Sequence, residues 1–121
     1  MDVATGREGP GGVGRRRGEG LRCRRRSDEG RLDILVTNAG VLRDTVLWKM
    51  SDDDFDTVID VHLRGTFTCV REAAIHMREA GEGGRIICIG SPTGQRGNFG
   101  QANYAAAKAG IVGMVRTWAM E

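Results

Sequence analysis

A tyrosine and a lysine near the end of the chain are spaced for acid–base chemistry. Tyr104 and Lys108 lie four residues apart in the segment YAAAK, so on a helix their side chains project from the same face. A nearby ammonium group favours the phenolate, which lets a tyrosine exchange a proton near neutral pH. The pair therefore indicates a proton donor or acceptor for a substrate oxygen.

A serine upstream of this pair is placed to bind the same oxygen. Ser91 follows the apolar run 85–89, and Gly90 ends that run, as expected for a buried strand that leads into a loop. Active sites of open α/β sheets lie at such strand ends. Serine, tyrosine and lysine together suit redox chemistry of carbonyl and alcohol groups.

Two strands and two helices are expected to position these residues. Residues 32–37 and 85–89 are short and apolar with branched side chains, which favours parallel strands. Ser51 is expected to cap a long amphipathic helix that ends at the glycine-rich turn 81–84. Residues 102–120 predict a second helix. This order predicts an α/β fold with part of a doubly wound parallel sheet.

Composition divides the 121-residue chain near Gly30. Residues 1–30 are dominated by glycine and arginine, including the arginine blocks 15–17 and 24–26, and contain few apolar residues. Such a segment buries too little apolar surface to offset its ordering entropy, so we expect residues 1–30 to be disordered. Residues 31–121 are expected to form one partial domain.

Several classes of function are disfavoured by the same sequence. Cys23, Cys69 and Cys88 fit no metal-ligand spacing, and no metal site is predicted. No apolar run approaches the ~18 residues of a membrane span, and no signal peptide is apparent, so a soluble, cytoplasmic protein is expected. The arginine blocks leave nucleic-acid binding open as an alternative, although no aromatic residues are interleaved for base stacking.

The segment from about residue 32 to residue 121 resembles the central part of the short-chain dehydrogenase/reductase family. The four residues TNAG at 37–40 are similar to the family's NNAG turn, and Ser91, Tyr104 and Lys108 match its catalytic residues in type and spacing. The resemblance implies a partial Rossmann domain and an oxidoreductase that uses NAD or NADP. It also implies a secondary alcohol or ketone as small-molecule substrate, and a homo-oligomer in the parent family.

The resemblance also implies roles for individual residues. Tyr104 would be the general acid or base, Ser91 would orient the substrate oxygen, and Lys108 would hold the nicotinamide ribose while favouring the Tyr104 phenolate. His62 stands where the family has a catalytic asparagine, whose backbone carbonyl it can also supply. Three residues after the first strand complete the set: Asn38 would brace the sheet, and Ala39 and Gly40 would let the cofactor approach the backbone.

Two segments narrow the resemblance. VHLRG at 61–65 and GNFGQANY at 97–104 are similar to the 3-hydroxyacyl-CoA dehydrogenase domain of peroxisomal multifunctional enzymes, which implies a 3-hydroxyacyl thioester substrate. The family's glycine-rich dinucleotide cradle and its substrate lid have no counterpart in this sequence. We therefore expect no turnover by the chain alone. A non-catalytic fragment that docks onto full-length relatives is the alternative, and the choice between NAD and NADP stays open.

Overall fold

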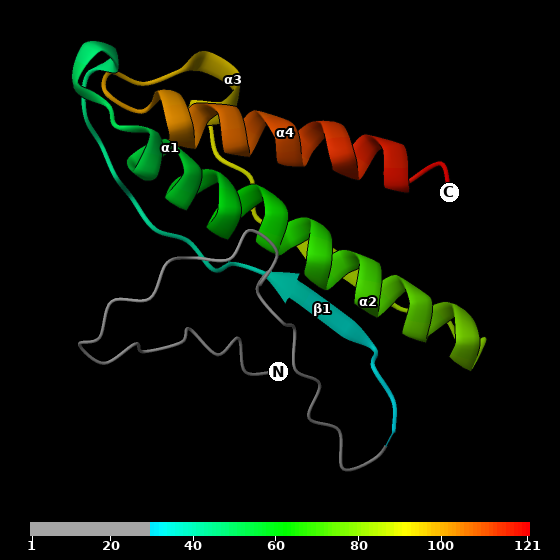
Figure 1. The fold of residues 1–121 in the computed structure, drawn as a ribbon. Coiled ribbons are helices and arrows are strands. Elements are labelled where there is room, and N and C mark those ends of the chain that lie inside the picture. The colour runs from blue at the N-terminus through cyan, green and yellow to red at the C-terminus, as the bar shows by residue number, and fades with distance from the viewer. Residues whose placement is uncertain (1–29) are drawn as a thin grey trace, which may run out of the picture.

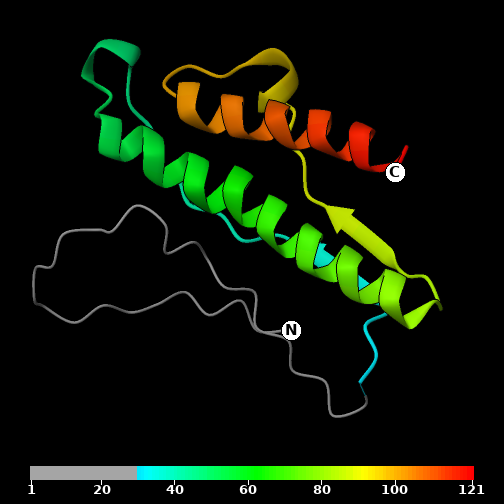
Figure 2. The same ribbon diagram turned by 45° about the vertical axis from the view of Figure 1, so that its right-hand side comes forward.

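Two parallel strands form the sheet of this protein. The computed structural model describes residues 30–121, so the expectation of disorder for residues 1–30 lies, except for Gly30, outside the described residues. Strands β1 (Ile34–Thr37) and β2 (Arg85–Cys88) pair in parallel, with Ile34 opposite Arg85 (Figure 1; β2 is the arrow seen in Figure 2). The partial parallel α/β architecture is confirmed, with each strand one or two residues shorter than predicted.

A continuous helical rod connects the two strands. It consists of α1 (Asp52–Ile59), a π-helical segment η2 (Asp60–Arg64) and α2 (Gly65–Ala80). The rod begins as predicted, because the Ser51 hydroxyl accepts a hydrogen bond from the Asp54 N–H at 3.1 Å. It ends at Gly81, whose φ of 69° is readily adopted only by glycine.

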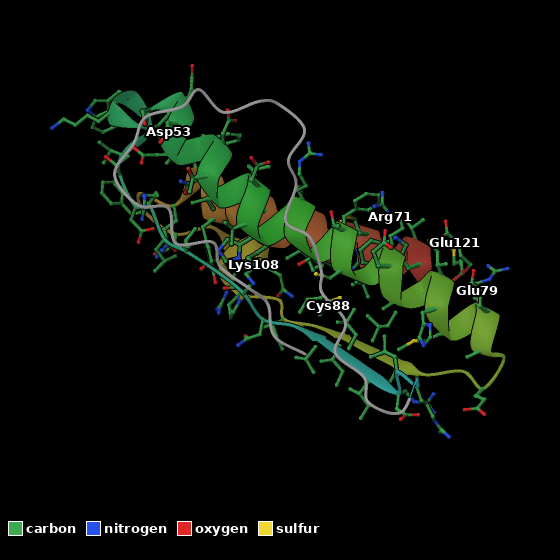
Figure 3. The ribbon with its side chains drawn as sticks, turned by 60° about the horizontal axis from the view of Figure 1, so that its bottom comes forward. Asp53, Arg71, Glu79, Cys88, Lys108 and Glu121 are labelled. Atoms are coloured by element: carbon green, nitrogen blue, oxygen red, sulfur yellow. The ribbon has the colours of Figure 1, made fainter. Side chains whose placement is uncertain are left out.

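The core lies between α2 and one face of the sheet. Leu35 of β1 packs with Cys69, Val70 and Ala73 of α2, and all four are buried. Cys88 of β2 packs against this cluster, and Figure 3 shows it between the strands and the rod. Side chains alternate along a strand, so the residues flanking Leu35 point to the opposite face, where they are exposed. The sheet is therefore covered on one face only among the described residues.

A second helix lies beside the rod and runs in the same direction (Figures 1 and 2). This helix, α4 (Ala102–Trp118), follows the short α3 (Thr93–Arg96), and a single 3-10 turn, η1 (Leu47–Lys49), precedes the rod. The contact is close, because a Cβ atom at Gly110 would lie 2.8 Å from Cδ1 of Leu63. Within residues 30–121 no helix is long and apolar enough to cross a membrane.

Candidate active site

The lysine of α4 is buried beside the end of β2. The side chain of Lys108 is 6% exposed, and its Nζ donates a hydrogen bond to the carbonyl oxygen of Ile89 at 2.7 Å. Burial lowers the Lys108 pKa from its ordinary value. The same Nζ lies 5.7 Å from the centre of the Tyr104 ring. The bond to a backbone carbonyl thus fixes the lysine next to the tyrosine, and it uses one of the three N–H donors of the lysine.

His62 packs against the other side of the tyrosine. Its ring meets the Tyr104 ring edge to face, with centroids 5.1 Å apart and planes at 89°. The Nε2 atom of His62 lies 3.1 Å from the N–H nitrogen of Val41 and 2.8 Å from its carbonyl oxygen, so the tautomer decides which bond forms. Nδ1 of His62 is buried with no hydrogen-bond partner among residues 30–121.

The environment of His62 favours the neutral imidazole. Burial lowers the His62 pKa from 6.5, and the positive charge of Lys108 lowers it further, while the hydrogen bond to Val41 acts in the opposite direction. His62 lies in the π-helical segment, where its carbonyl and that of Asp60 share the Gly65 N–H. A carbonyl has two lone pairs, so this sharing leaves the His62 carbonyl able to accept a second hydrogen bond.

The turn after β1 is shaped by His62. A Cβ atom at Gly40 would lie 2.5 Å from Cε1 of His62, closer than real contacts of this kind, so only glycine fits there without a shift. Asn38 and Ala39 are exposed, and within the described part of the chain the Asn38 side chain has no hydrogen bond. The structure therefore gives Gly40 a packing role, in addition to the cofactor role that the resemblance implies.

Ser91 is connected to this cluster through α3. Its hydroxyl accepts a hydrogen bond from the Thr93 N–H at 3.2 Å, and its carbonyl accepts one from Gly94 at 3.1 Å. A Cβ atom at Gly94 would lie 2.7 Å from the carbonyl carbon of Lys108, so α3 packs directly on the turn of α4 that carries the lysine. Of the predicted residues, His62 and Lys108 thus both lie next to Tyr104, and Ser91 lies in the adjoining loop.

The groups that hold this cluster in place were not predicted. Val41 holds His62, and Ile89 holds Lys108, through backbone atoms, and backbone partners leave no mark in residue type. The glycines were the available signal. Gly40 and Gly94 both mark places where one segment approaches another too closely for a side chain.

Comparison with known proteins identifies the family of this chain. The family model described as short chain dehydrogenase matches residues 22–121. The chain is 51% identical over 92 residues to "Peroxisomal multifunctional enzyme type 2" of Drosophila melanogaster, covering 76% of this chain and 15% of that protein. It is 46% identical over 92 residues to the 3-oxoacyl-(acyl-carrier-protein) reductase of Thermotoga maritima, covering 76% of this chain and 37% of the reductase.

A third relative aligns with the same share of this chain. The chain is 51% identical over 92 residues to "Peroxisomal hydratase-dehydrogenase-epimerase" of Saccharomyces cerevisiae, covering 76% of this chain and 10% of that protein. The chain therefore spans well under half the length of the curated relatives it matches. Because the family model covers most of the chain and the relatives share about half of the aligned residues, the chain belongs to the short-chain dehydrogenase/reductase family.

Proposed function

We propose that this site transfers a proton to or from the oxygen of a secondary alcohol or ketone during NAD(P)-dependent oxidoreduction. The observation that carries the proposal is the buried ammonium of Lys108. Its Nζ donates a hydrogen bond to the Ile89 carbonyl and lies 5.7 Å from the Tyr104 ring centre. In reduction, Tyr104 gives its hydroxyl proton to the substrate oxygen, and the lysine stabilises the phenolate that remains. Ser91 donates a hydrogen bond to the same oxygen, and oxidation reverses these steps.

The donor set suits a nicotinamide cofactor. Members of this family generally use NAD(P)H, and the bound cofactor would supply or accept the hydride. Lys108 uses one N–H on Ile89, which leaves two donors for the ribose hydroxyls. Asn38, Ala39 and Gly40 form an exposed turn at the carboxyl end of β1, where cofactors of open α/β sheets bind. The choice between NAD and NADP stays open.

A 3-hydroxyacyl or 3-oxoacyl thioester is the substrate class that we propose. One relative is named as a 3-oxoacyl reductase, and others are named as peroxisomal multifunctional enzymes. A 3-oxoacyl thioester has a ketone oxygen that the Tyr104 hydroxyl can protonate as the ketone is reduced to an alcohol.

A cytoplasmic location of the protein remains a prediction.

The test transfers the site into a longer relative. The segment of this chain that matches the Thermotoga maritima reductase over 92 residues replaces its counterpart, and loss of NADH or NADPH absorbance is followed with a 3-oxoacyl thioester. We expect turnover, and a Tyr104→Phe change in the same chimera should lower it by about 100- to 10,000-fold. A folded chimera with no turnover, or full turnover with Tyr104→Phe, contradicts the proposal. The 121-residue chain in the same assay tests the expectation that it is inactive alone.

A non-catalytic role is the second candidate. The observation that favours it is the exposed apolar face of the sheet, where Ile34, Val36 and Ile87 are 57%, 46% and 48% exposed. Such a face suits docking onto a full-length relative. Co-purification with such a subunit, without cofactor affinity, supports this role. Nucleic-acid binding by the arginine blocks concerns residues outside the described part and is tested by a gel shift at low salt.

A further inference from the structure

The residue before the tyrosine is a buried amide with three hydrogen bonds. Asn103 is fully buried, and its Oδ1 accepts a hydrogen bond from the Tyr104 N–H at 2.8 Å. Its Nδ2 donates to the carbonyl oxygen of Arg43 at 3.0 Å and to that of Asp54 at 3.3 Å. A buried polar side chain with all its bonds directed to backbone atoms fixes the position of those atoms relative to one another.

The bond to Tyr104 satisfies a group that the helix itself leaves without a partner. The first backbone bond of α4 runs from the Ala105 N–H to the Gln101 carbonyl at 2.8 Å, so the Tyr104 N–H precedes the intrahelical ladder. The Asn103 oxygen takes this N–H. The backbone of Tyr104 is thereby held at the point where its side chain leaves the helix.

The bonds from Nδ2 reach two segments that are distant in the sequence. Arg43 lies in the loop after β1, and Asp54 lies in the first turn of α1. The same loop contains Val41, which holds His62, and His62 packs on the Tyr104 ring. The tyrosine is therefore held twice from one loop: its ring through His62, and its backbone through Asn103.

We propose that Asn103 is the positioning residue of Tyr104, which sets the place of the phenol relative to the loop after β1. Its importance for turnover rests on the proposed function. Its effect on the geometry of Tyr104 does not, and the two are measured separately.

The experiment uses the fact that Tyr104 is the single tyrosine of the chain. Labelling tyrosine with ¹³C gives ring signals of that residue alone, and a nuclear Overhauser contact to the His62 ring reports their packing. Asn103→Ala removes both connections, whereas Asn103→Asp keeps an acceptor for the Tyr104 N–H and loses the donor to Arg43 and Asp54. We expect both variants to shift the ring signals and to weaken the contact with His62.

Gln101→Ala is the matched control. Gln101 also joins the start of α4 to the loop after β1, because its Nε2 donates to Oδ2 of Asp44 at 2.8 Å. Within residues 30–121 its side chain makes no hydrogen bond to Tyr104. We expect the ring signals of this variant to remain those of the wild type. If Gln101→Ala moves them as far as Asn103→Ala does, or if both Asn103 variants fold and leave them in place, the proposal is overturned.

Two further measurements keep the proposal testable if the alanine variant does not fold. In the wild type, the Tyr104 amide should exchange with solvent more slowly than the Ala102 amide, and equal rates would overturn the proposal. In the active chimera, Asn103→Asp should lower kcat by about 100-fold with little change in KM, because a misplaced acid weakens the chemical step. An inactive chimera whose NMR results are as expected would refute the proposed function and leave the positioning role standing.

Discussion

The first half of α4 buries polar side chains, whereas the two-stranded sheet exposes apolar ones. At the start of α4, Lys108 and Asn103 are 6% and 0% exposed, and each is bonded to backbone atoms of another segment. On the outer face of the sheet, Ile34 and Ile87 are 57% and 48% exposed. The acid–base geometry is therefore built from contacts among residues 40–110 and does not use the outer face of the sheet.

The largest expected effect separates the two faces of β1. Leu35→Ala should lower the free energy of unfolding by about 2–5 kcal/mol, because Leu35 is 1% exposed and packs on α2. Ile34→Ala, one residue earlier, should cost well under about 1 kcal/mol, because most of that side chain is already in water. Urea titration of both variants measures the difference. Equal losses would mean that the outer face is covered in solution, and the comparison would fail.

A smaller effect is expected from the turn that packs on His62. Gly40→Ala should lower the free energy of unfolding by about 1–3 kcal/mol, because the added Cβ would lie 2.5 Å from Cε1 of His62. Gly113→Ala is the control, because that position in α4 has no atom within 4 Å of an added Cβ. Alanine there should stabilise the helix by about 0.5–1 kcal/mol. Thermal unfolding measures both, and a harmless Gly40→Ala would show that the contact is loose.

The smallest expected effect is a loss of stability in acid. Burial lowers the His62 pKa below 6.5. Between the lowered pKa and about pH 6.5, the unfolded chain therefore binds a proton at this residue that the folded chain does not bind. The stability that depends on neutral His62 is therefore present above about pH 6.5 and is lost as the pH falls toward the lowered pKa. Thermal midpoints at about pH 7.5 and about pH 5 should differ less in His62→Asn than in the wild type. An unchanged difference would contradict this role of His62.

The periodic elements were predictable from the sequence, and their interruptions were not. Apolar spacing and the capping serine predict one long helix after Ser51, and the rod indeed runs from Asp52 to Ala80. Its π-helical turn at Asp60–Arg64 has no sequence signature, because the extra residue per turn is accommodated by packing against α4 and the loop after β1. The short α3 lies in the segment after Gly90, where a loop was expected, because four residues that include a glycine carry no periodic pattern.

In the site, residues recognised by their own spacing were predictable, and a residue that acts through backbone partners was not. Tyr104 and Lys108 were predicted together from their spacing, and the structure has both on one helix with Nζ near the ring. Among the described residues, no atom outside its own helix lies within 4 Å of a Cβ added at Gly113, whereas Gly110 packs on Leu63. Asn103 was missed, because its partners are carbonyl groups 60 and 49 residues earlier in the chain.

The bond between Lys108 and the Ile89 carbonyl holds the site in a way that substitution of the Ile89 side chain does not remove. Every amino acid has a carbonyl oxygen, so replacing Ile89 changes the neighbouring surface and leaves the acceptor in place. A mutational scan would then score this position as tolerant, although it holds the ammonium. Sequence variation at this position is therefore expected to be compatible with the same lysine geometry.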